Sequence, residues 1–235
     1  MSESLKAHPF LHQWLRLGAA GQVHALSGKV DLGQGISHAL RLIVAQELRL
    51  SPSLIDMVPA STHTSPDEAV TSGSLSVQHS GAALRCAAAH WREMCRLAMA
   101  QRCGVDVSGV RCANGEFSVQ ASTQTASYAE LTSAEMWHST IDTAHVQSPH
   151  AAQDANALPV SPTALRPDVA SKVFGEFEYI HDRVLPNMCH GMVFRPGTLT
   201  AEVIAHDMQA LVHHVQAQTG VLRVQQDGLL LGVLT

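Results

Sequence analysis

The first residues whose types and spacing could do chemistry are Gly33, Gln34 and Gly35, in the stretch GKVDLGQGISHALRLIVAQEL, residues 28–48. Glycine reaches positive φ and lets a ligand approach the main chain closely. The N–H groups at the start of a helix can bind an anion or an oxo group, and the amide of Gln34 both donates and accepts hydrogen bonds. The spacing therefore predicts either a ligand-binding loop or a tight turn between a strand and a helix.

A second candidate is TSGSLSVQHSG, residues 71–81, which combines small hydroxyl side chains, an amide and two glycines. Hydroxyl and amide groups beside a helix start suit a phosphate group or the edge of a heteroaromatic ring. The alternative is an ordinary polar cap on a buried helix. The hydroxyl and amide groups belong to Thr71, Ser72, Ser74, Ser76, Gln78 and Ser80, and Gly73 and Gly81 keep the backbone accessible.

Other catalytic signatures are absent from the sequence, which contains no G-x-S-x-G, no H-E-x-x-H and no P-loop with its lysine. Asp67 and Glu68 are adjacent carboxylates, but such neighbours in a loop are usually solvated. His206 and His213 could share a helix face, but no third ligand is in view. The five cysteines form no C-x-x-C pair, which indicates buried thiols rather than disulfides or an iron–sulfur cluster. The residues themselves predict no catalytic group and no metal held by protein side chains.

Composition restricts the class of protein. The 235 residues are 46% hydrophobic and 15% charged, which is typical of a globular protein, and the net charge of −5 gives no nucleic-acid footprint. No stretch is apolar enough for a transmembrane helix, and the first residues lack the pattern of a cleaved signal peptide. We expect a cytoplasmic protein, with a periplasmic or membrane-associated complex as the alternative.

The elements around the candidate residues follow from hydrophobic periodicity. Strands at Val23–Asp31 and Leu54–Pro59, joined by a helix at Ile36–Leu48, predict a parallel β-α-β unit. Alanine-rich sequence predicts a buried helix over Gly73–Cys103. Four local signals complete this region: a hairpin turn at Asn114-Gly115, a capping box at Ser127–Glu130, a helix stop at Gly104, and either a helix start or a plain loop at Ser65–Glu68.

Three regions divide the chain: a first unit over 1–138, a linker over 139–165 that is rich in polar residues and proline, and a second unit over 166–235. In the second unit FGEFEYIHD and CHGMVFRP indicate strands, Asp207–Gln218 a helix and Asp227-Gly228 a hairpin turn. We expect this unit to be incomplete, because a strand seldom closes a domain.

Several of these segments occur together in the order typical of one family. The stretch around Gly33-Gln34-Gly35, MVPASTHTSPDEAVTSGSLSVQHSGAALRCAAAHWR, SYAEL and KVFGEFEYIHDRVLPNMCHGMVFRP resemble the molybdenum-binding large subunit of the xanthine dehydrogenase and aldehyde oxidase family. The nearest branch is that of the isoquinoline 1-oxidoreductase β-subunit and the corresponding nicotinate dehydrogenase subunit. The resemblance extends from about Gly21 to the end of the sequence.

The resemblance implies an α+β fold, in which a molybdopterin-binding α/β portion precedes the start of an α/β hammerhead domain. It implies a molybdopterin cytosine dinucleotide cofactor, held by its own dithiolene, with [2Fe-2S] clusters only in a partner subunit. Gln34, between Gly33 and Gly35, would lie near the molybdenum oxo ligand. The cofactor would also contact Thr71, Ser72, Gly73, Ser74 and Gln78.

This sequence departs from the family pattern at several positions. Ala69 and Asn187 stand where the family more often has glycine, and Asn187 is tolerable because asparagine also reaches left-handed conformations. Further departures are Cys189, Met192 and Gly197. The glutamate base of the family belongs to a C-terminal portion without a counterpart here.

We therefore expect part of a molybdenum hydroxylase that oxidises an N-heterocycle or an aldehyde with oxygen from water. Its partners would be an iron–sulfur small subunit and the remaining large-subunit polypeptide, and the isolated chain would be inactive. The alternative is a non-catalytic remnant, or an interaction or cofactor-handling module that kept the fold.

Overall fold

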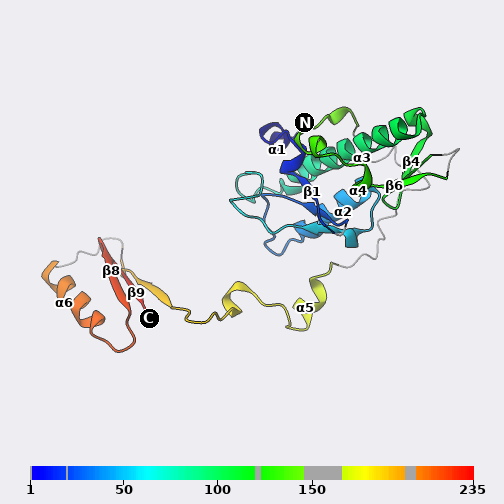
Figure 1. Cartoon of the computed structure of the whole chain (residues 1–235). Coiled ribbons are helices and arrows are strands. Elements are labelled where there is room, and N and C mark those ends of the chain that lie inside the picture. Colours follow the sequence, from blue (N-terminus) through cyan, green and yellow to red (C-terminus); the bar gives the residue numbers. More distant parts are fainter. Residues whose placement is uncertain (1, 20, 120–122, 146–165, 199–204) are drawn as a thin grey trace. The chain divides into compact units, whose positions relative to one another are not determined.

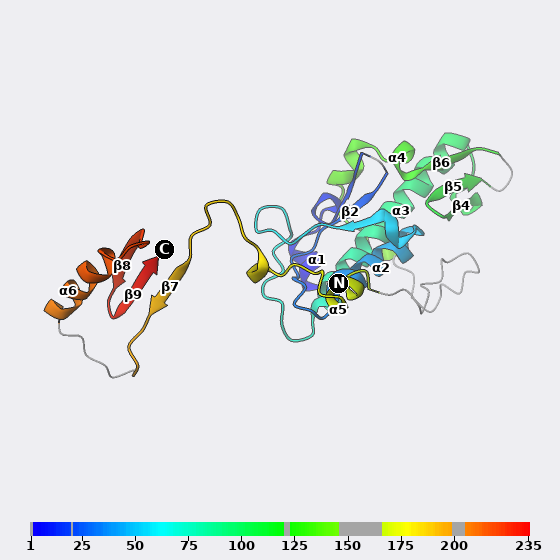
Figure 2. The ribbon, with the colours of Figure 1, turned by 90° about the horizontal axis from the view of Figure 1, so that it is seen from below.

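The computed structural model describes residues 2–19, 21–119, 123–145, 166–198 and 205–235 (Figures 1 and 2). They fall into two compact units, which we call the N-terminal unit, Met1–Val169, and the C-terminal unit, Ala170–Thr235. Helices and strands are mixed in both units, which agrees with the predicted α+β class.

The predicted β-α-β unit is confirmed in the first sheet. Its strands are β1 (Leu15–Leu17), β2 (Val23–Ala25) and β3 (Ile55–Met57), in that spatial order. β2 pairs antiparallel with β1 and parallel with β3, and helix α2 (Ile36–Leu48) makes the crossover between the parallel strands. The sequence did not predict β1.

The strands of this sheet are shorter than predicted, since β2 ends at Ala25 rather than Asp31. The Leu26 N–H still donates to the Trp14 carbonyl, but the N–H groups of Gly28, Lys29 and Val30 bond to side chains instead of to a neighbouring strand. Gly28 N–H donates to the Glu68 carboxylate, and Val30 N–H donates to the Thr71 hydroxyl. The main chain is thus drawn out of the sheet at the start of the candidate loop.

The long helix α3 (Ala82–Cys103) follows a five-residue π-helix, η3 (Val77–Gly81). The predicted helix began at Gly73, but Gly73 and Ser74 have φ of 64° and 57°. Positive φ cannot continue a right-handed helix, so the helix begins later. Its predicted stop is confirmed, because Gly104 takes a left-handed conformation at φ 64°.

Helix α2 packs along α3 over the core of the N-terminal unit, whose largest fully buried side chains include Trp14, Trp91 and Phe117. Beside α3 lies an antiparallel sheet in the order β4 (Val110–Ala113), β5 (Glu116–Val119) and β6 (Thr125–Ser127). The predicted hairpin is confirmed, as is the capping box that opens α4 (Tyr128–Leu131). Both predictions rested on signals within four residues.

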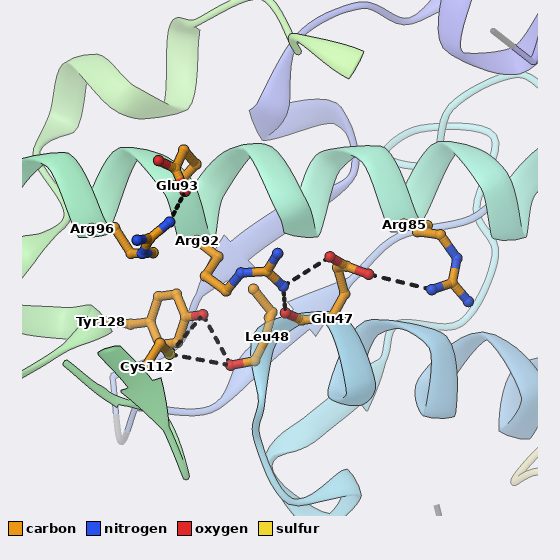
Figure 3. A network of polar contacts seen from close by, with 8 residues as sticks. All are labelled: Glu47, Leu48, Arg85, Arg92, Glu93, Arg96, Cys112 and Tyr128. Carbon is orange, nitrogen blue, oxygen red and sulfur yellow. Dashed lines mark hydrogen bonds and ion pairs between the residues drawn. The ribbon is translucent and has the colours of Figure 1, made fainter. Parts of the chain in front are cut away.

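A buried polar network joins α2 to α3 (Figure 3). The Glu47 carboxylate accepts from Arg92 at 2.8 Å and from Arg85 at 3.3 Å, and Arg92 also donates to the Glu47 carbonyl. The Tyr128 hydroxyl donates to the Leu48 carbonyl at 2.9 Å. Because buried charges are tolerated only when paired, this network constrains how α2 sits against α3.

Short elements complete the N-terminal unit: α1 (Glu3–Ala7), η1 (Leu11–Gln13), η2 (Pro52–Leu54), η4 (Val107–Gly109), η5 (Ala134–His138) and η6 (Thr143–His145). Ser65–Glu68 is a plain loop, the second of the two alternatives. Most of the predicted linker, residues 146–165, lies outside the described residues. Its first part packs on the N-terminal unit, since Ile141 is buried and its N–H donates to the Pro9 carbonyl.

After α5 (Val169–Val173) and η7 (Ile180–Asp182), the C-terminal unit forms an antiparallel sheet in the order β7-β9-β8. The strands are β7 (Gly191–Phe194), β8 (Arg223–Asp227) and β9 (Leu230–Leu234), with α6 (Ala205–Gln216) between β7 and β8. The strand in CHGMVFRP and the helix are confirmed. The hairpin loop is Gly228-Leu229, one residue later than predicted, because Asp227 pairs with Leu230.

The strand predicted in FGEFEYIHD is wrong. Gly175 has φ 73°, and the N–H groups of Glu176 and Phe177 bond back to the Ser171 carbonyl at 2.8 and 3.0 Å. These bonds form a helix-ending turn at the end of α5. The segment therefore cannot run straight on from α5 as an extended strand.

Candidate cofactor site

A cavity of about 400 Å³ lies beyond the carboxyl ends of β2 and β3. Because these strands are parallel, the segments that follow them, residues 27–31 and 58–60, leave the sheet at the same edge and form its walls. Ser37 and Leu40 of α2 also line it. A second cavity of about 320 Å³ shares Val30 and Ala60 with the first. Ligands of α/β sheets usually bind at this kind of position.

The glutamine loop, residues 31–37, connects the first cavity to α2. Gly33 and Gly35 have φ of 101° and 79°, which only glycine adopts without strain. The Asp31 carboxylate accepts the N–H groups of Gly33, Gly35 and Ser37 at 2.9, 3.3 and 3.4 Å. These N–H groups at the start of α2, which the sequence assigned to a ligand, are thus bound by Asp31.

The titration of Asp31 reflects this geometry. Partial burial is the largest single influence and raises the pKa of Asp31. It is outweighed by the hydrogen bonds from Gly33, Gly35 and Ser37 together with the charge of Arg166, so the net pKa lies below its usual range. Asp31 therefore carries its negative charge at the wall of the cavity.

The side chain of Gln34 folds back over its own loop. Its Oε1 accepts from the Leu32 N–H, and its Nε2 donates to the Val30 carbonyl at 3.0 Å. An amide has two N–H groups and two lone pairs, so one of each remains for a ligand. The residue is exposed and is not among those that line either cavity.

Arg166, three residues before the end of the N-terminal unit in sequence, contacts the glutamine loop. Its Nη1 donates to the Gly33 carbonyl at 3.2 Å, and its other nitrogens form a bidentate pair with Asp168 at 3.0 and 2.6 Å. A Cβ on Gly35 would lie only 2.7–2.9 Å from the guanidinium. A side chain at position 35 would therefore force the guanidinium to shift, in addition to the strain at this φ.

A buried polar cluster surrounds Glu68, which lines the second cavity. Its Oε2 accepts from the Ser27 hydroxyl at 3.1 Å and from the Gly28 N–H at 2.9 Å, and Ser27 also bonds to the Ser80 hydroxyl at 2.8 Å. Glu68 is 7% exposed, and its Oε1 is buried with no hydrogen-bond partner among the described residues. A buried carboxylate oxygen without a donor is costly, so this atom is a candidate for a donor from a ligand.

Lys29 adds a positive charge to this cluster. Its Nζ donates to the carbonyls of Glu68 and Val70 at 2.6 and 3.0 Å, which leaves one of its three N–H groups unused. The side chain is 7% exposed and lines the first cavity. A Cβ on Gly28 would meet the Pro66 carbonyl at 2.3 Å, so Gly28 permits the close passage of these two segments.

The hydroxyl-rich stretch joins the loop at one residue, since the Thr71 hydroxyl accepts the Val30 N–H at 2.9 Å. The side chains of Ser72, Ser74 and Gln78 are exposed and have no hydrogen-bond partner among the described residues. None of the residues predicted in this stretch lines either cavity. Their hydroxyl and amide groups remain available to a ligand.

Sequence reasoning missed Asp31, Lys29 and Glu68, which form the charged part of the site. Glu68 was interpreted as one of two solvated neighbours, but only Asp67 is exposed. A local signal for Asp31 existed, because aspartate just before a helix is a common acceptor for its first N–H groups. No local signal indicated Glu68, whose partners lie about 40 residues away.

Two absences hold for the described part of the chain. It has no group of three histidine, cysteine, aspartate or glutamate side chains that could bind a metal ion. None of its helices is long and apolar enough to cross a membrane. His206 of the predicted histidine pair lies outside the side chains that the structure describes.

Comparison with known proteins decides the family. A family model described as a molybdopterin cofactor-binding domain matches residues 3–164. The chain belongs to this family. The match confirms the molybdopterin-binding resemblance, and it covers the glutamine loop, the hydroxyl-rich stretch and both cavities.

Two relatives of this molybdopterin cofactor-binding chain are subunits of dehydrogenases. It is 36% identical over 182 residues to a nicotinate dehydrogenase subunit of Pseudomonas putida, covering 75% of this chain and 14% of the relative. It is 32% identical over 120 residues to the 6-hydroxypseudooxynicotine dehydrogenase complex subunit gamma of Paenarthrobacter nicotinovorans, covering 51% and 15%. The chain spans about a seventh of the length of these relatives.

A similarity to a solved structure is weaker. Reconstituted CO dehydrogenase from Oligotropha carboxidovorans is 26% identical over 50% of this chain and 15% of its own, with a TM-score of 0.45.

The residues of the two cavities and of the hydroxyl-rich stretch that follows them in sequence fit a molybdopterin in their donor and acceptor chemistry. A pterin ring carries N–H donors, and the buried Oε1 of Glu68 has no donor among the described residues. Phosphate oxygens accept hydrogen bonds, which the ammonium of Lys29 and the hydroxyls of Ser72 and Ser74 can donate. The family assignment and the local chemistry therefore agree.

Proposed function

We propose that this chain forms one wall of the cofactor site in a molybdenum hydroxylase of the xanthine dehydrogenase and aldehyde oxidase type. The observation that carries the proposal is the cavity at the carboxyl ends of β2 and β3, inside the segment that matches the molybdopterin cofactor-binding domain. The isoquinoline 1-oxidoreductase and nicotinate dehydrogenase branch is supported by the 36% identity to the nicotinate dehydrogenase subunit.

Each residue of the wall has a distinct role in this proposal. Lys29, Ser72 and Ser74 bind anionic oxygens of the cofactor, and Glu68 accepts from its pterin ring. Gly33 and Gly35 let the main chain approach the cofactor, while Gln34 orients a polar ligand with its remaining N–H and lone pair. We assign Thr71, Gly73 and Gln78 to the same cofactor surface, and the cytosine dinucleotide form as the cofactor.

The reaction replaces a C–H bond of an N-heterocycle or an aldehyde with a C–O bond. Water supplies the oxygen, two protons go to solvent, and two electrons leave through [2Fe-2S] clusters of a partner subunit. When bound, the molybdenum cofactor supplies the redox chemistry that this step requires. The residues of this chain bind and orient the cofactor.

Turnover in this proposal requires polypeptide beyond the 235 residues. General-base catalysis contributes about 10²–10⁴-fold, and none of the wall residues is assigned that role. The C-terminal unit is the start of an α/β hammerhead domain, with β7, β8 and β9 as part of its sheet. The isolated chain is therefore expected to lack hydroxylase activity.

Metal and pterin analysis tests the proposal. The chain is co-expressed with the polypeptides encoded beside it, and the purified complex is assayed for molybdenum and for the fluorescent oxidation product of the pterin. We expect about one of each per complex, and we expect loss of both in the double variant Ser72→Ala/Ser74→Ala, which removes two exposed hydroxyls without disturbing the core.

Ser133→Ala is the matched control, because this serine is also exposed, makes no side-chain hydrogen bond and lines neither cavity. It should retain molybdenum and pterin at the wild-type level. A stable wild-type complex without molybdenum would overturn the proposal and favour a non-catalytic module that kept the fold. Turnover by the isolated chain with an electron acceptor would overturn the requirement for further polypeptide.

A further inference from the structure

The glutamine loop is held by a contact that neither the sequence pattern nor the family match includes. The family match ends at residue 164, and Arg166 lies two residues beyond it. Arg166 nevertheless belongs to the N-terminal unit and donates to the Gly33 carbonyl, 133 residues earlier in the chain.

Three contacts fix the guanidinium on the loop. The bidentate pair with Asp168 uses Nε and Nη2, and this fork geometry orients the planar group. Nη1 then reaches the Gly33 carbonyl at 3.2 Å. The third contact is with Gly35, whose missing side chain leaves the guanidinium room against the main chain.

The charge of Arg166 also acts on the other end of the loop. It is one of the influences that favour the ionised form of Asp31, and Asp31 binds the N–H groups of Gly33, Gly35 and Ser37. The glutamine loop is thus bound by a carboxylate through its N–H groups and by a guanidinium through a carbonyl. Gln34 lies between them, and its remaining hydrogen-bonding groups are exposed.

We propose that Arg166 is the positioning residue of the glutamine loop, which it holds at Gly33 and Gly35 so that Gln34 keeps one orientation. Its importance for the cofactor rests on the proposed function, but its contact with the loop does not. A conservative change to lysine keeps the charge and loses the fork, so the two effects of Arg166 are separable.

A double-mutant cycle between Gly35→Ala and Arg166→Ala tests the contact in the full chain. Gly35→Ala introduces backbone strain at φ 79° and a collision with the guanidinium. In the Arg166→Ala background only the strain remains. Gly21→Ala is the matched control, because Gly21 has φ 78° and a Cβ added there would meet no atom of the described residues within 4 Å.

Chemical denaturation of the N-terminal unit gives the readout. In the wild-type background we expect Gly35→Ala to raise the unfolding equilibrium constant about threefold more than Gly21→Ala, near the lower end of measured couplings between contacting residues, because the guanidinium can shift. With Arg166→Ala the two glycine variants should have the same effect. If the difference between Gly35→Ala and Gly21→Ala were the same with and without the Arg166 side chain, the proposal would be overturned.

A second readout separates positioning from general stabilisation. In NMR titrations, Arg166→Gln should raise the pKa of Asp31, whereas Arg166→Lys should leave it low. Arg183→Ala, in the exposed pair with Glu178, is the control and should leave the pKa of Asp31 unchanged. An Asp31 pKa that Arg166→Gln does not move would overturn the proposal.

The two proposals fail in different ways. A complex without molybdenum overturns the proposed function and leaves the double-mutant cycle intact. If the effects of Gly35→Ala and Arg166→Ala simply add, while the complex still binds molybdenum, the role of Arg166 is overturned and the proposed function stands.

Discussion

The N-terminal and C-terminal units differ in how their described residues bury apolar side chains. In the N-terminal unit Trp14, Trp91 and Phe117 are fully buried, and Glu47 of α2 is paired with Arg85 and Arg92 of α3. In the C-terminal unit the buried apolar side chains among the described residues are Met208, Leu231 and Val233, each retaining 5–9% exposure. The comparison teaches that the two units depend on different amounts of core for their stability.

An apolar cavity in the C-terminal unit also indicates that its apolar side chains are incompletely buried. It has a volume of about 390 Å³ and lies between α6 and the sheet, where Met208, Leu211 and Val215 face residues of β9. Leu211 is 45% exposed and Phe194 is 53% exposed. Large apolar side chains of the kind that the N-terminal unit buries are therefore partly exposed to solvent in the C-terminal unit. The predictions below test this contrast, from the largest expected effect to the smallest.

Cysteine labelling should give the largest difference. Burial raises the pKa of Cys95 in α3 to about 12, whereas Cys189 of the C-terminal unit is exposed. At pH 8 about 10⁻⁴ of a thiol with that pKa is thiolate, so Cys189 should react at least about a thousandfold faster with iodoacetamide. Mass spectrometry of timed samples measures the two rates. Similar rates in the folded protein would contradict the burial of Cys95.

The second-largest difference is expected in the stability cost of breaking an ion pair in each unit. Glu47→Gln leaves Arg92 buried without its carboxylate, which should cost the N-terminal unit about 3–5 kcal/mol. The matched variant in the C-terminal unit, Glu178→Gln, removes an exposed pair with Arg183 and should cost less than about 1 kcal/mol. Urea unfolding measures both. Equal costs would show that burial does not distinguish the two pairs.

Leucine truncation compares the cores directly. Leu231→Ala in β9 should destabilise the C-terminal unit by about 2 kcal/mol, the lower end of the usual range, because its surroundings are open. Leu84→Ala in α3 should cost more, since Leu84 is fully buried. Hydrogen exchange resolves the units separately. A larger loss for Leu231→Ala than for Leu84→Ala would reverse the comparison.

Two positions with left-handed backbone should give the smallest effects. Ala69 has φ 56°, so Ala69→Gly should relieve strain and stabilise the N-terminal unit by about 0.5–1 kcal/mol. Asn187 has φ 59°, but asparagine tolerates this region, so Asn187→Gly should change the C-terminal unit by less than Ala69→Gly changes the N-terminal unit. Thermal unfolding measures both, and destabilisation by Ala69→Gly would show that strain is absent there.

These two positions also show what the sequence could predict. The resemblance implied glycine at positions 69 and 187, and Ala69 and Asn187 both have left-handed backbone in the structure. The hairpin at Asn114-Gly115 and the stop at Gly104 were likewise predictable, because glycine and asparagine encode these conformations within one or two residues.

The charged part of the site could not be predicted in this way. Ser27 and Gly28 meet Glu68 across about 40 residues, and Arg166 meets Gly33 across 133. Such pairs depend on how strands and loops pack, and no periodicity in the sequence encodes them. The glutamine loop was found from its glycines, whereas the groups that hold it were found only from the fold.

The contact between Arg166 and Gly33 has a consequence for biosynthesis. A ribosome adds about 5–20 residues per second, so roughly 7–27 s separate the synthesis of Gly33 from that of Arg166, 133 residues later. During that interval the loop has its glycines and its Asp31 acceptor but not its guanidinium.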